Sequence, residues 1–505
     1  MACLALTGCI VGPDFQRPTA PDSSAYAPQS LPSDTVAAMA SFGAAQRFDA
    51  QQDVPADWWS LFNSPKLNAL VERALKASPD IEAAQAALRQ AQQYARMQRS
   101  AFFPVLGAGY SASRTKLAGN DSGNAPGPQN NGDSYDPQTN SEEDLTPTAI
   151  FYNYHVAQLS VGYAPDIFGA VRRQVEALNA QVEASRFELE AARITLASNV
   201  TAAAFQEASL RAQIAAMQNI VAGERETLGI LQKRLDLGDI AGVEVAVQES
   251  ALAQAEATLS PLRLQLELTR DQLRALLGNP QDSELPETFT LDELQLPQNL
   301  PLTLPSRLVE QRPDVRIAEA ALHAASAEYG VAVAARLPQF VVSGAVGGMA
   351  PSPNWMFKGG GGFFDLSADI AYTIFDGGAL RAQSRAAQEA LIVAGAQYRA
   401  TVIAALQDVA DTLHTLQSDA EVLDAAARNQ HALGEVVRVS MQKQYEAGYV
   451  SHLDVLAAEQ EDWQTRIDLA QAQAARLSDT AALYQALGGG WWNRVDDAAN
   501  EENAR

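Results

Sequence analysis

The chain has 505 residues, a formal net charge of −24 and only 19% charged residues. This length allows a large core, and the acidic balance argues against a nucleic-acid-binding protein, in which a basic face is expected. The sequence contains no HExxH, CxxC or phosphate-binding glycine motif, so neither an enzyme nor a protein with a cofactor or metal is indicated. It also contains no run of eighteen apolar residues, so we expect no membrane-spanning helix.

The N-terminus carries a candidate lipidation site. Leu6-Thr7-Gly8-Cys9 resembles a bacterial lipobox, in which acyl chains are attached to the cysteine after cleavage. Residues 1–9 are too short for a whole signal peptide and lack its basic start, so we interpret them as a truncated lipoprotein signal. Polar and proline-rich residues 10–55 follow as a tether. The alternative is a cysteine without a special role.

Two segments far apart in the chain repeat one pattern. Residues 77–106 and 311–340 each begin near a Pro-Asp-aliphatic motif, carry Ala-Ala-Leu on the same helical step and reach a proline after the same interval. Each pattern predicts a helix followed by a strand. The chain therefore contains two copies of one unit, which we place at residues 56–278 and 305–490.

Each copy continues with a strand, a loop, a strand, a very long helix, a break and a second helix. Alternation of apolar and polar residues predicts strands at about 102–114, 152–164, 339–348 and 363–373. A helix without internal proline runs to about Leu237 in the first copy, and its counterpart runs to Ala447. Proline-rich residues 279–304 link the copies, and residues 491–505 form a tail.

The long helices require neighbours along their whole length. Roughly 65 residues from Val171 to Leu235, at ~1.5 Å per residue, give a helix on the order of 100 Å long. Its apolar residues recur at steps of three and four, as in a coiled coil. The same estimate places the helix breaks at 238–243 and 448–454 about 100 Å from the strands.

The four strands resemble those of membrane barrels, with one apolar and one polar face. Four strands cannot close around a lumen, and open sheet edges are not tolerated in lipid. Two chains would supply eight strands and a filled barrel, whereas three supply twelve and leave a lumen, so we infer a trimer. A small soluble sheet remains the alternative, because alternation is a weak signal.

The strand predicted at 363–373 shows the strictest alternation. Phe364, Leu366, Ile370 and Tyr372 share one face, which we expect to face lipid. Asp365 and Asp369 lie on the other face, which we expect to line the lumen.

Several motifs, taken in order, resemble the outer membrane factor family of TolC-like efflux channels, in its lipidated NodT-type branch. These motifs span nearly the whole chain: CIVGPDFQRP after the lipobox, ADWWSLFNSPKLNALVERAL at 56–75, PDIFGAVRR, IFDGGALR and YEAGYVSHLDVL. The resemblance implies a homotrimer with a twelve-strand outer membrane β-barrel that continues into a periplasmic α-helical barrel. The fold class is thus long helices plus a membrane β-sheet.

The resemblance also implies function and partners. Such a channel docks to a periplasmic adaptor and, through it, to an inner-membrane transporter of the resistance-nodulation-division class. It passively exports small molecules such as drugs from a Gram-negative cell and performs no covalent chemistry. We therefore expect an outer membrane protein, anchored by lipid on Cys9 and extending into the periplasm.

The resemblance further implies roles at the channel entrance. Leu453 and Asp454 match the stretch that narrows the entrance, with a single ring of carboxylates because Ala457 replaces a second acid. Tyr445 and Glu244 match residues that latch neighbouring helix pairs in the closed state. The alternatives are a helix-capping role for Asp454, interhelix packing for Tyr445 and a solvated position for Glu244.

Two other functions remain open at this point. One is the exit duct of a type I protein secretion system, which uses a similar channel. The other is a periplasmic coiled-coil adaptor without a barrel. A hydrolytic enzyme on a helical scaffold is not supported, because the sequence shows no cluster of nucleophile, base and metal ligands.

Overall fold

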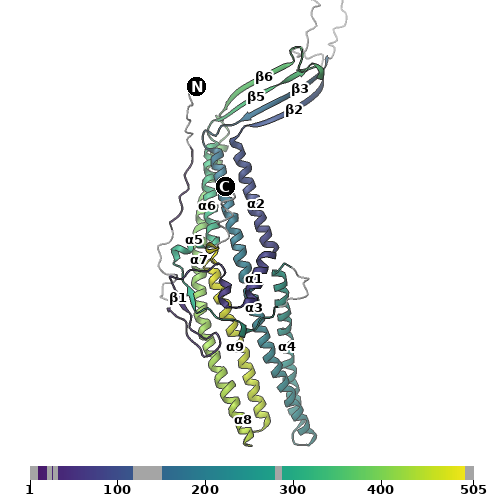
Figure 1. The fold of residues 1–505 in the computed structure, drawn as a ribbon, viewed down its shortest axis with the longest axis vertical. Helices are drawn as coiled ribbons and strands as arrows, with labels where there is room; N and C mark the ends of the chain where they lie inside the picture. The colour runs from purple at the N-terminus through teal and green to yellow at the C-terminus, as the bar shows by residue number, and fades with distance from the viewer. Residues whose placement is uncertain (1–9, 20–25, 27–31, 118–149, 279–286, 495–505) are drawn as a thin grey trace, which may run out of the picture. The chain divides into compact units, whose positions relative to one another are not determined.

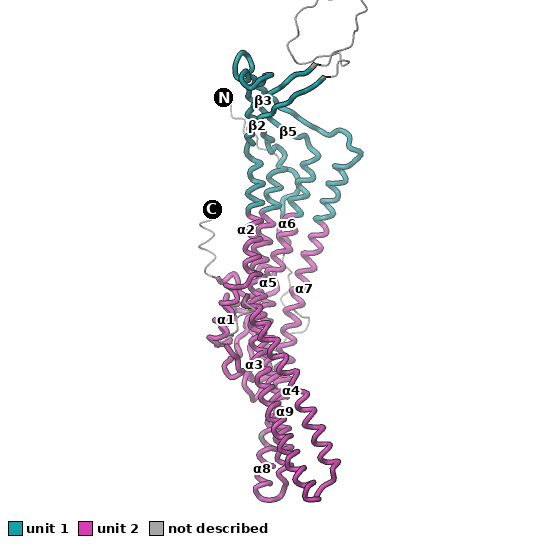
Figure 2. Tube along the Cα trace, turned by 90° about the vertical axis from the view of Figure 1, so that its right-hand side faces the viewer, with its two compact units in different colours: residues 1–15, 93–178, 325–391 teal, residues 16–92, 179–324, 392–505 magenta. Residues whose placement is uncertain are grey.

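The computed structural model describes residues 10–19, 26, 32–117, 150–278 and 287–494. The chain divides into two compact units, shown in Figure 2. Unit 1 comprises residues 1–15, 93–178 and 325–391, and unit 2 comprises residues 16–92, 179–324 and 392–505. Helices α2, α3, α6 and α7 contribute residues to both units.

Unit 1 contains a four-stranded antiparallel sheet with the strand order β2-β3-β5-β6 (Figure 1). Its strands are β2 (Val105–Leu117), β3 (Ile150–Tyr163), β5 (Gln339–Ala350) and β6 (Gly362–Ala371). Each repeat supplies one hairpin, and the hairpins join where β3 pairs with β5. Strands β2 and β6 are therefore the open edges of the sheet in one chain.

The first strand begins later than the sequence predicted. A short 3-10 turn, η2 (Ser100–Phe102), precedes it, and β2 starts at Val105 rather than near residue 102. Pro104 has no amide hydrogen for a sheet ladder, which explains the later start. The other strands begin within two residues of the predicted positions.

Unit 2 is built mainly from helices around one large hydrophobic core. Trp58 stacks on Tyr484 with ring centroids 5.6 Å apart, and Phe62 meets Phe205 edge-on at 4.8 Å. These rings connect the 3-10 turn η1 (Trp58–Phe62) to the long helices of both repeats. The helices, some with residues in unit 1, are α1 (Pro65–Ala77), α2 (Pro79–Arg99), α3 (Ala170–Asp236), α4 (Gly242–Leu276), α5 (Pro305–Gln311), α6 (Pro313–Ala334), α7 (Ala379–Asn429), α8 (Arg438–Glu446) and α9 (His452–Ala486).

The long helices of the two repeats differ in length by one residue. Helix α3 is continuous over 67 residues, whereas Ala379–Glu446 spans 68 residues and contains a π-helical turn, η5 (Gln430–Val437), between α7 and α8. A π-bulge adds one residue to a helix without breaking it. The long helix that the sequence predicted up to Ala447 is confirmed as one helix over Ala379–Glu446, and only the π-helical turn within it was not predicted.

Two segments predicted as connections carry structure. Strand β1 (Arg47–Asp49), within the predicted tether 10–55, pairs in parallel with β4 (Asn299–Pro301), within the predicted linker 279–304. Nearby, the buried Arg476 donates to Gln46 Oε1 at 3.3 Å and Thr35 Oγ1 at 2.9 Å. A buried guanidinium needs such acceptors, so the part of the tether around Thr35 and Gln46 packs on α9 within unit 2.

Within the described residues, one helix, over Ala379–Glu446, is by length and composition apolar enough to cross a membrane. The sequence predicted no membrane-spanning helix because it has no run of eighteen apolar residues, and length and composition alone do not contradict that prediction. The helix also contributes Val402, Ala405 and Val409, at steps of three and four, to the core of unit 2. Because core helices reach the same apolar content, the composition is weak evidence for a membrane span.

Candidate functional site

The sheet of unit 1 separates apolar from polar side chains by face. The register aligns Ala108, Leu159, Val346 and Phe364 in one row across all four strands, and Val161 and Leu366 lie in the next. Phe364 is 84% exposed and Leu366 79% in the single chain. A broad apolar sheet face whose large side chains are this exposed in the described chain is suited to lipid rather than water.

The opposite face carries small and polar side chains. Asp365 lies opposite Ala345, and Asp369 lies opposite Val341. Ser343 and Ser367 form a hydrogen bond across the strands at 2.7 Å. Asp365 and Asp369 thus lie on the face opposite Phe364, Leu366 and Ile370, while Tyr372 falls just beyond the end of β6.

The two long helices end in the same way. Gly238 and Gly448 adopt positive φ angles of 78° and 79°. In each repeat two backbone amides donate back to carbonyls of the last helical turn. In the first repeat, Gly238 N donates to Leu235 O at 2.8 Å and Asp239 N donates to Arg234 O at 2.9 Å. In the second repeat, Gly448 N donates to Tyr445 O at 2.8 Å and Tyr449 N donates to Gln444 O at 2.9 Å. This motif requires a left-handed residue, which glycine adopts without strain.

Asp454 forms part of a helix cap. Ser451 accepts the amide of Asp454, and the Asp454 carboxylate accepts the Ser451 amide at 2.8 Å and its hydroxyl at 2.7 Å. These bonds, the hydroxyl first, lower the pKa of the exposed Asp454 carboxyl. Asp454 therefore caps α9 as the alternative reading proposed, and the neighbouring Leu453 is half-buried.

Tyr445 and Glu244 lie beside the two helix breaks. The Tyr445 ring lies 5.3 Å from the ring of His452, and His452 Nε2 lies 2.9 Å from Glu226 Oε1 on α3. Glu244 is exposed in the first turn of α4. No hydrogen bond joins Tyr445 to Glu244 among the described residues of this single chain. Sequence reasoning missed the His452–Glu226 contact, because its partners are 226 residues apart.

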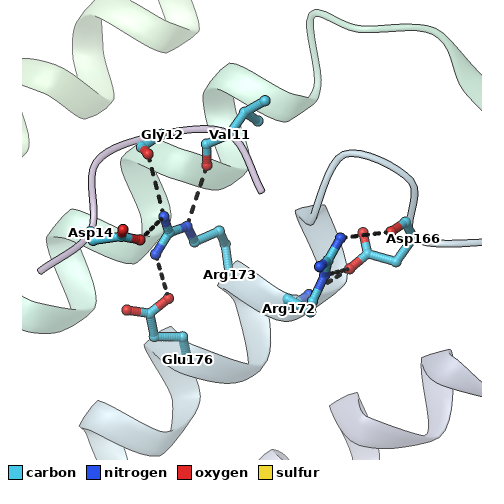
Figure 3. Close-up of polar contacts among 7 residues, drawn as sticks. All are labelled: Val11, Gly12, Asp14, Asp166, Arg172, Arg173 and Glu176. Carbon is cyan, nitrogen blue, oxygen red and sulfur yellow. Dashed lines mark hydrogen bonds and ion pairs between the residues drawn. The ribbon is translucent and has the colours of Figure 1, made fainter. Parts of the chain in front are cut away.

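An N-terminal strap is clamped beside the start of α3 (Figure 3). Arg173, whose side chain is 5% exposed, donates to Val11 O and Gly12 O at 3.3 Å, to Asp14 Oδ1 at 2.7 Å and to Glu176 Oε2 at 2.8 Å. A β-carbon on Gly12 would lie only 2.5 Å from the Gly330 Cα of α6. This clamp fixes residues 11–14 within unit 1, whereas Cys9 lies outside the described residues.

Asp166 caps the start of α3 next to this clamp. Its carboxylate accepts the amides of Val171 and Arg172, both at 3.0 Å, and the side chain of Arg172. Asp376 caps α7 in the same manner, accepting the amides of Gly378 at 2.7 Å and Leu380 at 2.8 Å. The Leu380 amide and then the Gly378 amide lower the pKa of Asp376. Among the described residues, no three His, Cys, Asp or Glu side chains are grouped to hold a metal ion.

Comparison with known proteins identifies the family. The family model described as "Outer membrane efflux protein" matches residues 70–279 and 304–489, one segment for each repeat. The chain belongs to the outer membrane efflux protein family. The adaptor alternative is thereby excluded.

Individual relatives and a solved structure agree with this. The chain is 30% identical over 440 residues to the pyoverdine export outer membrane protein OpmQ of Pseudomonas putida, covering 86% of this chain and 88% of OpmQ. It is 26% identical over 503 residues to the toluene efflux pump outer membrane protein TtgF of Pseudomonas putida, covering 99% of this chain and 98% of TtgF. The structure of the outer-membrane channel OprN superimposes with a TM-score of 0.78 at 26% identity, covering 96% of this chain and 100% of OprN.

These findings confirm the predicted family and the TolC-like fold of long helices plus a β-sheet. The chain is an outer membrane channel of tripartite efflux pumps in Gram-negative bacteria, and it is not an enzyme.

Proposed function

We propose that this efflux channel is a homotrimer whose three sheets close into a twelve-strand barrel around a lumen. The segregation of side chains on the sheet carries this proposal: Leu159, Val346 and Phe364 lie on one face, and Asp365 and Ser367 on the other. Lipid requires an apolar exterior and closed edges, and a lumen requires polar walls. Pairing of the edge strands β2 and β6 between neighbouring chains would satisfy both requirements.

Two adjacent arginine substitutions test this arrangement. Leu366→Arg places a charge on the proposed lipid face, at a cost of ~2–4 kcal/mol near the membrane midplane, whereas Ser367→Arg places the same charge in the lumen at little cost. We expect Leu366→Arg to reduce the yield of heat-modifiable trimers in outer membrane fractions, and Ser367→Arg to assemble normally. Equal yields would overturn the assignment of the faces.

The long helices would continue the channel into the periplasm as an α-helical barrel that docks to an adaptor and a resistance-nodulation-division transporter. We propose that it passes small toxic compounds, since OpmQ and TtgF serve pyoverdine export and toluene efflux. In a strain without its own channel, the gene should restore solvent or drug resistance only together with an adaptor and transporter. Resistance restored by the channel alone would refute this dependence.

Lipid on Cys9 would add a second membrane anchor to the barrel. The sequence Leu6-Thr7-Gly8-Cys9 supports this proposal. A chain with a complete signal peptide should incorporate labelled palmitate, and Cys9→Ser should abolish the label while trimers still form. Labelling that persists in Cys9→Ser would disprove lipidation at this residue.

At the entrance, we propose that Leu453 forms an apolar collar beside a ring of Asp454 carboxylates. Tyr445 and Glu244 would latch neighbouring helix pairs across the assembled ring. The exposure of Glu244 and Asp454 at the helix breaks supports these roles. Asp454 would then serve both as a helix cap and as a source of negative charge in the pore.

A further inference from the structure

The apolar face of the sheet changes to basic at one end. On β2 this face carries Leu106, Ala108, Tyr110 and Ala112, and then Arg114 and Lys116 at the same spacing of two residues. Both basic side chains are exposed. The carboxylates of Asp365 and Asp369 lie on the opposite face. In the described strands of this strongly acidic protein, the charges on this face are therefore basic.

A shallow groove precedes the basic end. Its volume is about 650 Å³, and its lining includes Ala108, Tyr110, Ala157, Leu159, Val346 and Phe357. The bottom of the groove is formed by the small side chains of Ala108 and Ala157, which lie between the larger side chains of Tyr110 and Leu159.

The turn between β5 and β6 forms one wall of the groove. Met356 in this turn is buried, and the Phe357 ring lies so close to Gly348 that a β-carbon on Gly348 would be 2.8 Å from the ring. Gly348 belongs to the apolar face, opposite Ala157. The turn therefore folds toward this face and narrows the groove on one side.

Polar groups line the passage from the groove to the basic residues. The Tyr110 hydroxyl lies 2.9 Å from His155 Nδ1, and His155 pairs with Ala112 in the register. Lys116 Nζ lies 5.5 Å from the centroid of the Phe151 ring. Along β2, Arg114 lies six positions after Ala108, or ~20 Å away at ~3.4 Å per residue. This length suits an acyl chain that ends at a charged headgroup.

We propose that this face is a binding site for a phosphorylated glycolipid of the lipid A type, with one acyl chain in the groove and a phosphate between Arg114 and Lys116. The inference rests on the proposed membrane-spanning role of the sheet. The basic residues lie at the end of β2 away from helix α2, which precedes that strand. If the helices are periplasmic, this end reaches the outer leaflet. Arginine and lysine bind phosphate by charge-assisted hydrogen bonds, which gives the site its preference for an anionic headgroup.

Native mass spectrometry of detergent-purified trimers, titrated with bisphosphorylated lipid A, tests the site. Each base near an anionic lipid contributes about fivefold, so Arg114→Ala with Lys116→Ala should weaken binding about 30-fold. The matched control is Arg89→Ala with Arg263→Ala, which removes the same charge from exposed positions on α2 and α4 and should bind as wild type does. Equal weakening in the control would overturn the proposal.

Two further binding measurements test the roles of the headgroup phosphates and of the groove. Wild-type trimers should bind monophosphoryl lipid A about fivefold more weakly than the bisphosphorylated form, a comparison that requires no variant. Ala157→Phe fills the groove floor and should weaken binding about tenfold without altering the bases. Equal binding of phosphatidylglycerol and lipid A would overturn the assignment to a glycolipid.

Failure of this inference is distinguishable from failure of the channel proposal. Wild-type trimers that insert and conduct in planar bilayers, yet bind lipid A no better than phosphatidylcholine, would refute the lipid site alone. Chains that form no trimers would refute the proposed assembly instead.

Discussion

Gly434, in the π-helical turn, lies directly against the buried carboxylate of Asp462 on α9, and a β-carbon on this glycine would overlap Asp462 Oδ1. The same carboxylate lies 3.3 Å from Arg438 Nε and 3.0 Å from Arg466 Nη2. The extra residue of the second long helix is thus accommodated where Gly434 packs against the ion-paired carboxylate of Asp462. Nothing comparable interrupts α3, which is helical throughout.

Gly434→Ala should therefore destabilise the protein, although alanine favours helices. Overpacking costs ~1–3 kcal/mol and the gain in helix propensity is ~1 kcal/mol, so we expect a net loss of up to about 2 kcal/mol in the free energy of unfolding. Gly229→Ala on α3 is the matched control, because its β-carbon would meet no atom of the described chain within 4 Å. Denaturant titration of both variants measures the difference, and a stabilised Gly434→Ala would contradict the close contact.

The pair Asp419 and Asp479 predicts a pH dependence of stability. Burial, then the hydrogen bond and repulsion from Asp479, raises the pKa of Asp419 to about 7 from an ordinary value of 3.8. The folded state therefore holds a proton that the unfolded state releases, and stability falls as the pH rises from about 4 to about 7. The positive charge of Arg476 favours the ionised form of Asp419 and so reduces the rise of its pKa.

Asp419→Asn should remove this loss of stability. Relative to wild type, the free energy of unfolding of the variant should be about 1–2 kcal/mol more favourable at pH 8 than at pH 5, a range that allows for solvent screening of a half-buried group. Thermal unfolding at the two pH values measures it. Asp411→Asn, which changes an exposed carboxylate on the same helix, should leave the pH profile unchanged. Identical profiles for Asp419→Asn and wild type would contradict the shifted pKa.

Tyr445→Phe tests the proposed latch, because it keeps the ring and removes the hydroxyl donor. A charge-assisted hydrogen bond from Tyr445 to Glu244 of a neighbouring helix pair would contribute ~1.5–3 kcal/mol, so its loss should favour the open state. We expect a larger mean conductance in planar bilayers. Tyr449→Phe, whose residue is 83% exposed at the adjoining turn, is the control. Unchanged conductance in Tyr445→Phe would show that Tyr445 does not hold the entrance closed.

Asp454→Asn separates the two roles of Asp454. Asparagine retains an oxygen that can accept the Ser451 amide, but it removes the charge. If the carboxylates form a ring in the pore, the variant should show a lower cation preference in reversal-potential measurements, with nearly unchanged stability. Ser451→Ala should do the reverse, losing ~1 kcal/mol of capping with selectivity intact. An unaltered cation preference in Asp454→Asn would restrict the residue to capping.

Arg173→Lys should release the N-terminal strap. A lysine ammonium has three donors, too few for the carbonyls of Val11 and Gly12 together with Asp14 and Glu176. We expect a loss of ~2 kcal/mol in stability and faster protease cleavage within residues 10–19. Arg381→Lys, at an exposed position on α7, is the control. A strap that stays protected would show that the Gly12–Gly330 contact alone holds it.

The sequence by itself determined the repeat, the long helices and the alternating strands, because these depend on local periodicity. The alternation that placed Leu366 and Asp365 on opposite faces survives folding, since side chains point to alternate sides of any strand. Helix ends at Gly238 and Gly448 were likewise recognisable, because a left-handed C-terminal residue favours glycine.

Only the tertiary structure decided which distant residues meet. The π-helical turn at 430–437 leaves no local signal, because it depends on the fit of Gly434 against Asp462 from another helix. The Arg173 clamp joins residues about 160 positions apart, and the His452–Glu226 contact joins residues 226 apart. Such partners depend on how the helices pack, and packing is set by the shapes of side chains from the whole chain rather than by any local pattern.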